Sequence, residues 1–351
     1  MNFRIDRWSA TALRSSLVAV TVAGSLLLAS CGGGGGGTNY KPTRMIAFGD
    51  EFSVITPVSG GLAIDAKKYS INGFTAASTT VVANTEANCY TNPLWIQSIA
   101  FNFGLVFAEC NDIPNAVTTA FIRATPGATV ADVVNQITNF LNEPIGTLVK
   151  SDLVTIMVGT NDVLELYQQV RTSGSTDAAK SAALTAATNR GALLAAQFDR
   201  VTRYGSNDKA RALYVLIPDV GSTPYAYAEE ALTAGSRALL TSLTRAFNDQ
   251  LRSKITINGR SIGQINIFDT YQNIVNNPKA AADAGILNIT DAACVPADIL
   301  QCTSATLQPA TGTAAAATDA TWLWAQDVYF GPIGHSLLSS GALSIINNNP
   351  F

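Results

Sequence analysis

The residues best placed for chemistry follow an apolar segment near the start of the chain. Residues 45–48 read Met-Ile-Ala-Phe, the pattern of a buried strand, and Gly49-Asp50 then turns the chain so that Glu51 is presented at the carboxyl end of the strand. Open α/β sheets carry their ligand sites at that edge. A carboxylate there can accept hydrogen bonds or exchange a proton, but it cannot become the alkoxide of a serine nucleophile. Glu51 is therefore the first candidate site residue.

A second carboxylate offers a rival chemistry. Glu51 and Asp327 could act as an acid–base pair of the kind that cleaves glycosidic bonds. The only other features typical of a sugar site are Trp322 and Trp324, and we expect these rings to pack in the core or at the site rim.

Serine and metal chemistry have weaker support. Ser53 could pair with His335, the single histidine of the chain, but in an extended segment Ser53 faces away from the turn. We expect His335 to be a packed or hydrogen-bonded helix residue. Asp50, Glu51 and Asp162 make a weak metal-ligand set, so we expect no metal and no cofactor.

The elements that must position these residues alternate between strand and helix patterns. Continuous apolar runs predict buried strands at residues 45–48, 153–158, 212–217 and 265–268, and apolar residues at helical spacing predict helices around residues 130–141, 177–203, 239–251 and from 332 to 347. Such alternation indicates an α/β fold, a three-layer α/β/α arrangement around a mostly parallel sheet. Residues 53–90 fit neither period and are predicted to be a long surface insertion.

Five segments in this order resemble the GDSL (SGNH) esterase and lipase family over residues 43 to 345. They are Phe-Gly-Asp-Glu-Phe-Ser at 48–53, Pro-Gly-Ala-Thr at 126–129, Val-Gly-Thr-Asn-Asp at 158–162, the strand-to-loop segment at 216–224, and residues 324–335. The resemblance implies an SGNH hydrolase fold, which is flavodoxin-like, and an ester-hydrolase site. It places Glu51 where the family has its attacking serine.

The last of these segments departs from the family as well. The family carries Asp-x-x-His there, followed about five residues later by glycine. Counting back from Gly334 without gaps puts Tyr329 at the histidine position and Gln326 at the aspartate position. Sliding by one residue rescues Asp327 but places Phe330 at the histidine. Neither register supplies a general base.

The family's oxyanion donors are retained. The resemblance assigns this role to the backbone N–H of Gly127 and to the side-chain amide of Asn161. Our hypothesis is that the Glu51 carboxylate occupies the position that an oxyanion would take, because buried donors need partners. The alternative is a Glu51 side chain that swings into solvent.

The first residues indicate export rather than a fold element. Arg4, Arg7 and Arg14 precede an apolar run, and Leu-Ala-Ser-Cys at residues 28–31 resembles a bacterial lipobox. We expect a signal peptide at residues 1–30, a lipid on Cys31, a glycine-rich tether to residue 42 and one domain at 43–351. Gly32 after the cysteine resembles lipoproteins sent to the outer membrane, so the predicted partner at this end is a membrane.

The remaining cysteines are an even set. Cys89, Cys110, Cys294 and Cys302 predict two disulfides in an exported protein, and nearness in the chain favours Cys89–Cys110 and Cys294–Cys302. A zinc site has little support because the chain has no Cys-x-x-Cys and one histidine.

Composition narrows the partners further. Charged residues make up 13% of the chain and the net charge is -3, which argues against a nucleic-acid partner. The sequence therefore predicts a lipid-anchored envelope protein with a degenerate esterase site that binds a small-molecule, acyl or glycan ligand or serves a structural role. The alternative is an active ester hydrolase with non-standard catalytic residues.

Overall fold

A five-stranded parallel sheet forms the centre of the domain in the computed structural model, which describes residues 40–59, 62–73, 88–111, 116–204, 207–257, 259–312 and 315–347. The strand order is β4-β1-β5-β8-β9. The strands are β1 (Arg44–Gly49), β4 (Ala120–Ile122), β5 (Asp152–Met157), β8 (Arg211–Leu216) and β9 (Ile262–Asn266). All pairings are parallel, so the carboxyl ends of the strands meet at one edge.

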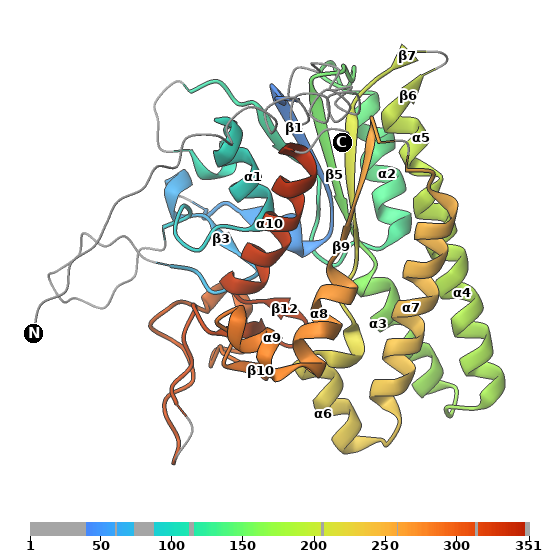
Figure 1. The fold of residues 1–351 in the computed structure, drawn as a ribbon, viewed down its shortest axis with the longest axis vertical. Coiled ribbons are helices and arrows are strands. Elements are labelled where there is room, and N and C mark those ends of the chain that lie inside the picture. Colours follow the sequence, from blue (N-terminus) through green and yellow to red (C-terminus); the bar gives the residue numbers. More distant parts are fainter. Residues whose placement is uncertain are drawn as a thin grey trace, which may run out of the picture. The chain divides into compact units, whose positions relative to one another are not determined.

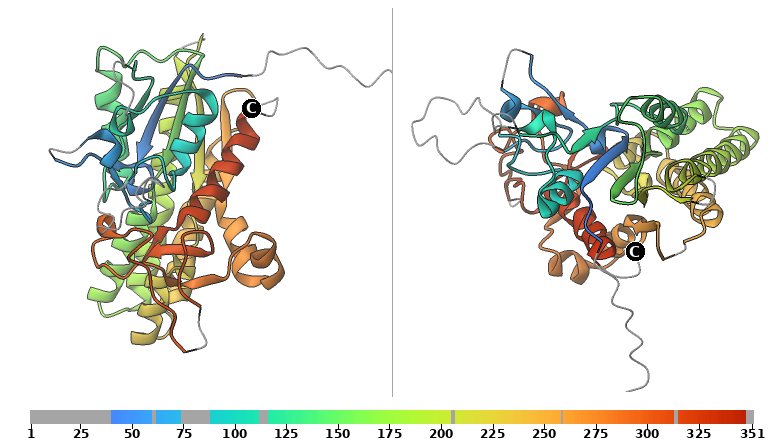
Figure 2. Two further views of the ribbon diagram at one scale, coloured as in Figure 1. Left: turned by 90° about the vertical axis from the view of Figure 1, so that its left-hand side faces the viewer. Right: turned by 90° about the horizontal axis from the view of Figure 1, so that it is seen from above.

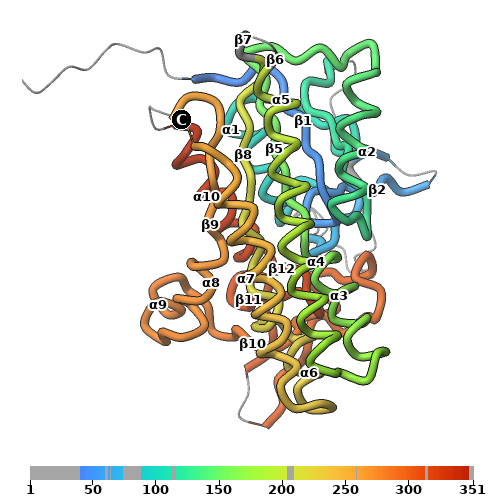
Figure 3. The backbone as a smooth tube through the Cα atoms, turned by 90° about the vertical axis from the view of Figure 1, so that its right-hand side faces the viewer, coloured from blue at the N-terminus to red at the C-terminus, as the bar shows by residue number. Residues whose placement is uncertain are grey.

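Helices cover both faces of this sheet, as Figure 1 shows. One face packs under α2 (Val130–Leu141), α3 (Thr160–Thr172), α4 (Asp177–Ala195), α5 (Gln197–Thr202) and α7 (Ser236–Lys254), which lie in front of the sheet in Figure 3. The other face packs against α1 (Trp95–Phe103) and α10 (Pro332–Asn347). The view from above in Figure 2 separates the two layers. The predicted three-layer α/β/α fold is confirmed.

Alternation along β1 explains the two layers. Ile46 and Phe48 belong to the core on the α2 face, whereas Met45 and Ala47 belong to the core on the α1 and α10 face. Successive side chains of a strand point to opposite faces, so a strand buried on both sides is apolar throughout. This is why a continuous apolar run was a valid strand signal.

The predicted elements differ from the observed ones in several places. The strand expected at residues 265–268 ends at Asn266, because the Asn266 side chain caps a new helix, α8 (Ile267–Asn276). The helix expected at 177–203 breaks at Ala196 into α4 and α5. The three-residue strand β4 was not predicted, since it is too short to show a period.

Smaller elements gather beyond the carboxyl edge of the sheet. A three-stranded sheet has the order β10-β11-β12, and α8 and α9 lie beside it in Figure 1. Its strands are β10 (Asn288–Ala292), β11 (Trp322–Gln326) and β12 (Tyr329–Phe330). Not all remaining elements of the described residues lie at this edge, since β6 (Arg203–Tyr204) and β7 (Asn207–Asp208) lie at the opposite end of the sheet in Figure 1. The others are α6 (Pro224–Leu232), α9 (Pro278–Asp283), the short strands β2 (Ile55–Thr56) and β3 (Lys67–Lys68), and the 3₁₀ turns η1 (Glu51–Ser53), η2 (Ala63–Asp65), η3 (Ala108–Cys110), η4 (Val220–Ser222) and η5 (Ile299–Gln301).

The segment predicted as a surface insertion is largely interior where it is described. Ala66, Lys68 and Asn72 are buried, and the Asn72 amide donates to the Cys302 carbonyl at 3.1 Å. The prediction of a surface insertion was therefore wrong for residues 66–73. Aperiodic sequence shows that a segment is irregular, but it does not show whether the segment lies inside or outside.

Both predicted disulfides, Cys89–Cys110 and Cys294–Cys302, are present. The predicted signal peptide and Cys31 lie outside the described residues. At the end of the predicted tether, Tyr40 packs on the domain and its hydroxyl donates to the Asp152 carbonyl at 2.8 Å. Over the described ranges, none of the helices combines the length and apolar character that a bilayer crossing requires.

Candidate active site

The turn after β1 is shaped by close backbone packing. Gly49 has φ +137°, and a Cβ at this position would lie 1.9 Å from the Met157 carbonyl oxygen of β5, so only glycine fits. Gln136 of α2 accepts from the Gly49 N–H and donates to its carbonyl, each at 2.9 Å. Asp50 then caps the 3₁₀ turn Glu51–Ser53 by accepting from the Phe52 N–H. These contacts hold Glu51 at the carboxyl edge of the sheet.

The Glu51 carboxylate lies against both retained donors. It is 2% exposed, and its Oε2 accepts from the Gly127 backbone N–H at 2.8 Å. The Asn161 amide donates to both carboxylate oxygens, at 3.2 and 3.1 Å. The expected contacts are therefore present, and the alternative of a solvent-facing Glu51 is wrong. Gly127 reaches this position with φ +74°, a conformation that glycine adopts without strain.

The donors are themselves fixed by the start of α2 and α3. Asn161 lies in the first turn of α3 and donates a further hydrogen bond to the Ala128 carbonyl at 3.2 Å. Its neighbour Asp162 accepts from the Val130 N–H at 3.0 Å and contacts Arg190 at 3.2 Å. Burial raises the pKa of Asp162 to about 6, and the Arg190 charge opposes this rise. Asp162 therefore ties two helix starts together.

Asp50 is the second buried acid at this turn. It is fully buried, and its Oδ2 has no hydrogen-bond partner among the described residues. Burial, reinforced by the charge of Glu51, raises the pKa of Asp50 well above its usual range. Burial therefore favours the protonated form of Asp50, whereas the Glu51 carboxyl group beside it accepts hydrogen bonds from two donors.

The residues that the sequence resemblance assigns to the acid and base positions lie on the β11–β12 hairpin, in which Gln326 pairs with Tyr329. The Gln326 amide donates to the carbonyls of Pro296 and Ala297, at 3.1 and 3.0 Å. Asp327 is exposed at the turn with φ +29°. Neither side chain forms a hydrogen bond with Glu51 or Tyr329 in the part of the chain that is described.

Tyr329 is the member of this group whose pKa the charge of Glu51 influences. Its half-buried ring packs on Tyr69, with 5.8 Å between ring centroids. Burial and then the charge of Glu51 raise the pKa of the Tyr329 phenol, and the same two causes in the same order raise that of Tyr69. A phenol held in its protonated form cannot serve as a general base at neutral pH.

His335 lies in α10, packed against aromatic rings. Its ring is T-shaped to Phe330, at 5.7 Å between centroids, and tilted against Phe52, and neither ring nitrogen has a hydrogen-bond partner among the described residues. Burial, together with the charge of Lys68, lowers the pKa of His335 to about 3. Ser53 is occupied elsewhere, since its hydroxyl accepts from the Trp95 indole at 3.2 Å. The Ser53–His335 pair is not formed.

The tryptophans of the glycoside-hydrolase alternative are used in packing. Trp324 is fully buried against Tyr271 and Phe330, and its indole donates to the Ile289 carbonyl at 3.1 Å. Trp322 is half-buried against the small core beneath the three-stranded sheet. Over the described ranges, no group of three His, Cys, Asp or Glu side chains lies where it could hold a metal ion.

Sequence reasoning missed three residues around the site. Gln136 could have been found, because it is a polar residue on the apolar face of a predicted helix. Lys68 and Tyr69 gave no signal, since they lie in the segment that was taken for a surface insertion. Only the tertiary fold brings Tyr69 against Tyr329 at the site.

Similarity to known proteins identifies the family of the chain. The model of the family described as GDSL-like Lipase/Acylhydrolase matches residues 84–284. The chain belongs to this family. The matched range includes Gly127 and Asn161, but it excludes Glu51 and Tyr329.

Among solved structures, the chain is similar to three lipolytic proteins. A lipase from a goat rumen metagenome has 11% identity and a TM-score of 0.45, with 88% of this chain and 99% of that chain covered. A phospholipase A1 from Streptomyces albidoflavus has 13% identity and a TM-score of 0.42, with 87% and 98% covered. A member of the lipolytic G-D-S-L family from Veillonella parvula has 13% identity and a TM-score of 0.38, with 86% and 96% covered. A search of curated proteins finds no match.

Proposed function

We propose that this GDSL-family protein no longer hydrolyses esters and serves a binding or structural role in the bacterial envelope, anchored by a lipid on Cys31. The observation that supports this best is the Glu51 carboxylate hydrogen-bonded to the Gly127 N–H and the Asn161 amide. The donors that would stabilise a developing oxyanion are already engaged by the Glu51 side chain.

The chemistry of ester cleavage supports the same proposal. Hydrolysis by a serine needs an alkoxide, a base that takes its proton and a group that orients the base. Glu51 supplies no alkoxide, the raised pKa of Tyr329 removes it as a base, and Gln326 is bonded to Pro296 and Ala297. In triad hydrolases, loss of the catalytic group costs on the order of 10⁶ in turnover.

An ester assay tests the proposal. Nitrophenyl acetate and nitrophenyl palmitate are offered to the chain without residues 1–31, and to its Glu51→Ala variant. We expect both proteins to match the rate without enzyme. Hydrolysis by the parent that the substitution abolishes would instead establish the alternative function, an ester hydrolase that uses Glu51 in a non-standard way.

Two further variants separate the missing parts of the site. Glu51→Ser alone should remain inactive, since no base faces position 51. Glu51→Ser with Tyr329→His places an imidazole on the side of the hairpin that faces Glu51, so it is the variant in which weak hydrolysis is expected. Adding Gln326→Asp should contribute little, because the amide of Gln326 faces the carbonyls of Pro296 and Ala297.

The proposed anchor rests on residues 28–31, Leu-Ala-Ser-Cys, and on the glycine run that follows. The proposed location is the outer membrane, facing either the periplasm or the cell surface. The full chain is expressed in a bacterium with its own first residues, and the intact mass of the mature protein is measured. We expect a chain that starts at Cys31 and carries acyl groups, and a mature chain without acyl groups would remove the anchor from the proposal.

A further inference from the structure

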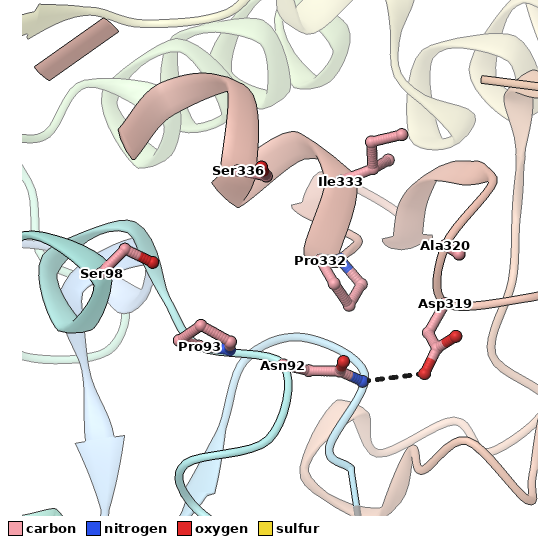
Figure 4. Close-up of a pocket in the computed structure, with 8 residues that line it drawn as sticks. All are labelled: Asn92, Pro93, Ser98, Asp319, Ala320, Pro332, Ile333 and Ser336. Atoms are coloured by element: carbon pink, nitrogen blue, oxygen red, sulfur yellow. Dashed lines mark hydrogen bonds between the residues drawn. The ribbon is translucent and has the colours of Figure 1, made fainter. Parts of the chain in front are cut away.

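A pocket of about 370 Å³ opens between α1, the first turn of α10 and the loop before β11 (Figure 4). Its volume falls in the range of small-molecule sites. None of the candidate site residues discussed above lines it. The residues that matter for its chemistry are Asn92, Ser98, Asp319, Pro332, Ile333 and Ser336.

The polar groups of the pocket include both donors and acceptors. The hydroxyls of Ser98 and Ser336 have no hydrogen-bond partner among the described residues, so both are available to a ligand. The Asp319 Oδ2 accepts from the Asn92 amide at 3.1 Å and from the Ser304 hydroxyl at 2.9 Å. The Oδ1 of Asp319 and the amide oxygen of Asn92 make no hydrogen bond in the described part of the chain, and they supply two acceptors.

Asn92 is held in place by a buried lysine. Lys68 is 0% exposed, and its Nζ donates to the backbone carbonyls of Cys89, Thr91 and Asn92, at 3.0, 2.6 and 2.9 Å. The Asn92 amide also donates to the Ile71 carbonyl at 3.2 Å. With φ +54°, Asn92 adopts a left-handed conformation that asparagine tolerates better than most residues. Its amide oxygen is therefore pre-organised on the pocket wall.

The remaining lining is apolar. Pro332 and Ile333 of α10 present carbon surface beside the four polar groups. A purely apolar ligand would strip water from those polar groups without replacing it. An anion would meet the Asp319 carboxylate. A small cation would pair with Asp319, but it would leave the carbon surface of Pro332 and Ile333 uncovered. A neutral ligand that has several hydroxyls and an apolar face satisfies all of these groups.

We propose that this pocket binds a neutral polyhydroxylated ligand, a single pyranose unit of a sugar. Its hydroxyls donate to Asp319 and Asn92 and accept from Ser98 and Ser336, while the C–H face of the ring lies on Pro332 and Ile333. Glu51 does not line this pocket. The sugar-binding proposal can therefore be confirmed or refuted independently of the function proposed above.

Saturation-transfer NMR and calorimetry on the full chain, in a polyoxyethylene detergent that carries no sugar, test the pocket. The probes are methyl glucoside, methyl galactoside and N-acetylglucosamine, with choline, acetate and cyclohexanol as the cationic, anionic and apolar controls. We expect at least one pyranose to bind with a Kd on the order of 1 mM, and the three controls not to bind. Binding of no pyranose up to about 50 mM, or of a control in place of a pyranose, overturns the proposal.

Variants locate the binding. Ser98→Ala with Ser336→Ala removes two ligand hydrogen bonds and should weaken binding about tenfold. Asp319→Asn keeps an acceptor for Asn92 and Ser304, but it puts a donor where the ligand needs an acceptor, so a similar loss is expected. The matched control is Ser242→Ala with Ser253→Ala, on the exposed face of α7, which should bind as the parent does. If the Ser98/Ser336 double variant and Asp319→Asn bind the pyranose as tightly as the control variant does, the sugar binds elsewhere and the proposal is overturned.

Discussion

The two sides of the candidate active site differ in how their residues are bonded. On the side of α2 and α3, the donors Gly127 and Asn161 are in place and hold the Glu51 carboxylate. On the side of the β11–β12 hairpin and α10, the acid position is tied to a loop and the base position carries a phenol. The single imidazole is packed among aromatic rings.

The difference follows from what else each residue does. Asn161 also binds the Ala128 carbonyl, and its neighbour Asp162 caps the start of α2, so this side is part of the framework. The hairpin side chains at 326 and 327 contact only loops or solvent, and there the framework does not depend on their chemistry. Under the proposed function, the donors persist because the framework needs them, whereas the hairpin positions are free to change.

Gly49→Ala should give the largest effect on stability, because it disturbs the packing of β1 against β5. The new Cβ would lie 1.9 Å from the Met157 carbonyl oxygen and force a left-handed alanine, so we expect a loss of about 4 kcal/mol in the free energy of unfolding. Urea denaturation measures it. The control is Gly104→Ala, which is also left-handed but meets no atom within 4 Å and should lose about 1 kcal/mol. Equal losses would show that the close approach of β1 and β5 is not tight.

Glu51→Ala tests the same side of the site, because it leaves the two donors without their acceptor. The Gly127 N–H and the Asn161 amide lose a charged acceptor, and we expect a loss of about 2–3 kcal/mol. Acetate should then raise the melting temperature of the variant, since it can enter between the donors, but not that of the parent. The same acetate response in both proteins would mean that Glu51 does not fill this position.

The pH dependence of stability probes the hairpin side through His335. Its pKa in the folded chain is lowered to about 3, so between this value and the ordinary value near 6.5 the unfolded chain takes up a proton that the folded chain excludes. Stability is therefore lost as pH falls, by about 2 kcal/mol from pH 7 to pH 5.

His335→Phe should remove this contribution, and denaturant midpoints at the two pH values measure it. Asp162, whose pKa is raised to about 6, contributes in the opposite direction in both proteins, so only the difference between parent and variant reports on the histidine. An identical pH profile in the two proteins would show that His335 is reached by water or by a partner.

Gln326→Ala should give the smallest effect. It removes two hydrogen bonds to backbone carbonyls near the surface, and we expect a loss of about 1 kcal/mol. Gln169→Ala, on an exposed helix face where the amide contacts only Glu165, is the matched control and should change stability by less than about 0.5 kcal/mol. A loss as large as that of Glu51→Ala would place the hairpin within the framework.

Most of the sheet could be predicted because its strands are buried on both faces. Apart from a charged first residue in each and Thr155 in β5, the strands β1, β5 and β8 carry no side chain that prefers water to a core. The exceptions are local. β4 has too few residues to show a period, and the end of β9 is set by the Asn266 side chain, which caps α8 by accepting from the Asp269 N–H.

The site could be predicted only where a short motif carries it. Gly127 and Asn161 stand in segments with a recognisable order, and the turn at Gly49-Asp50 announces Glu51. Tyr69 and Lys68 come from a segment without periodicity, so their burial depends on contacts with residues more than 20 positions away. Contacts between residues so far apart produce no pattern in the local sequence.

The chain by itself determined that a glutamate follows Gly49-Asp50, that His335 is its single histidine and that four cysteines can form two local bridges. These are matters of residue identity and spacing, which the covalent chain carries. Tertiary structure decided which groups the carboxylate meets, that the histidine is buried and that Lys68 is buried behind Asn92 of the pocket. Hydrogen bonding and desolvation depend on which atoms the fold brings within a few ångströms, and that is a property of the packed molecule.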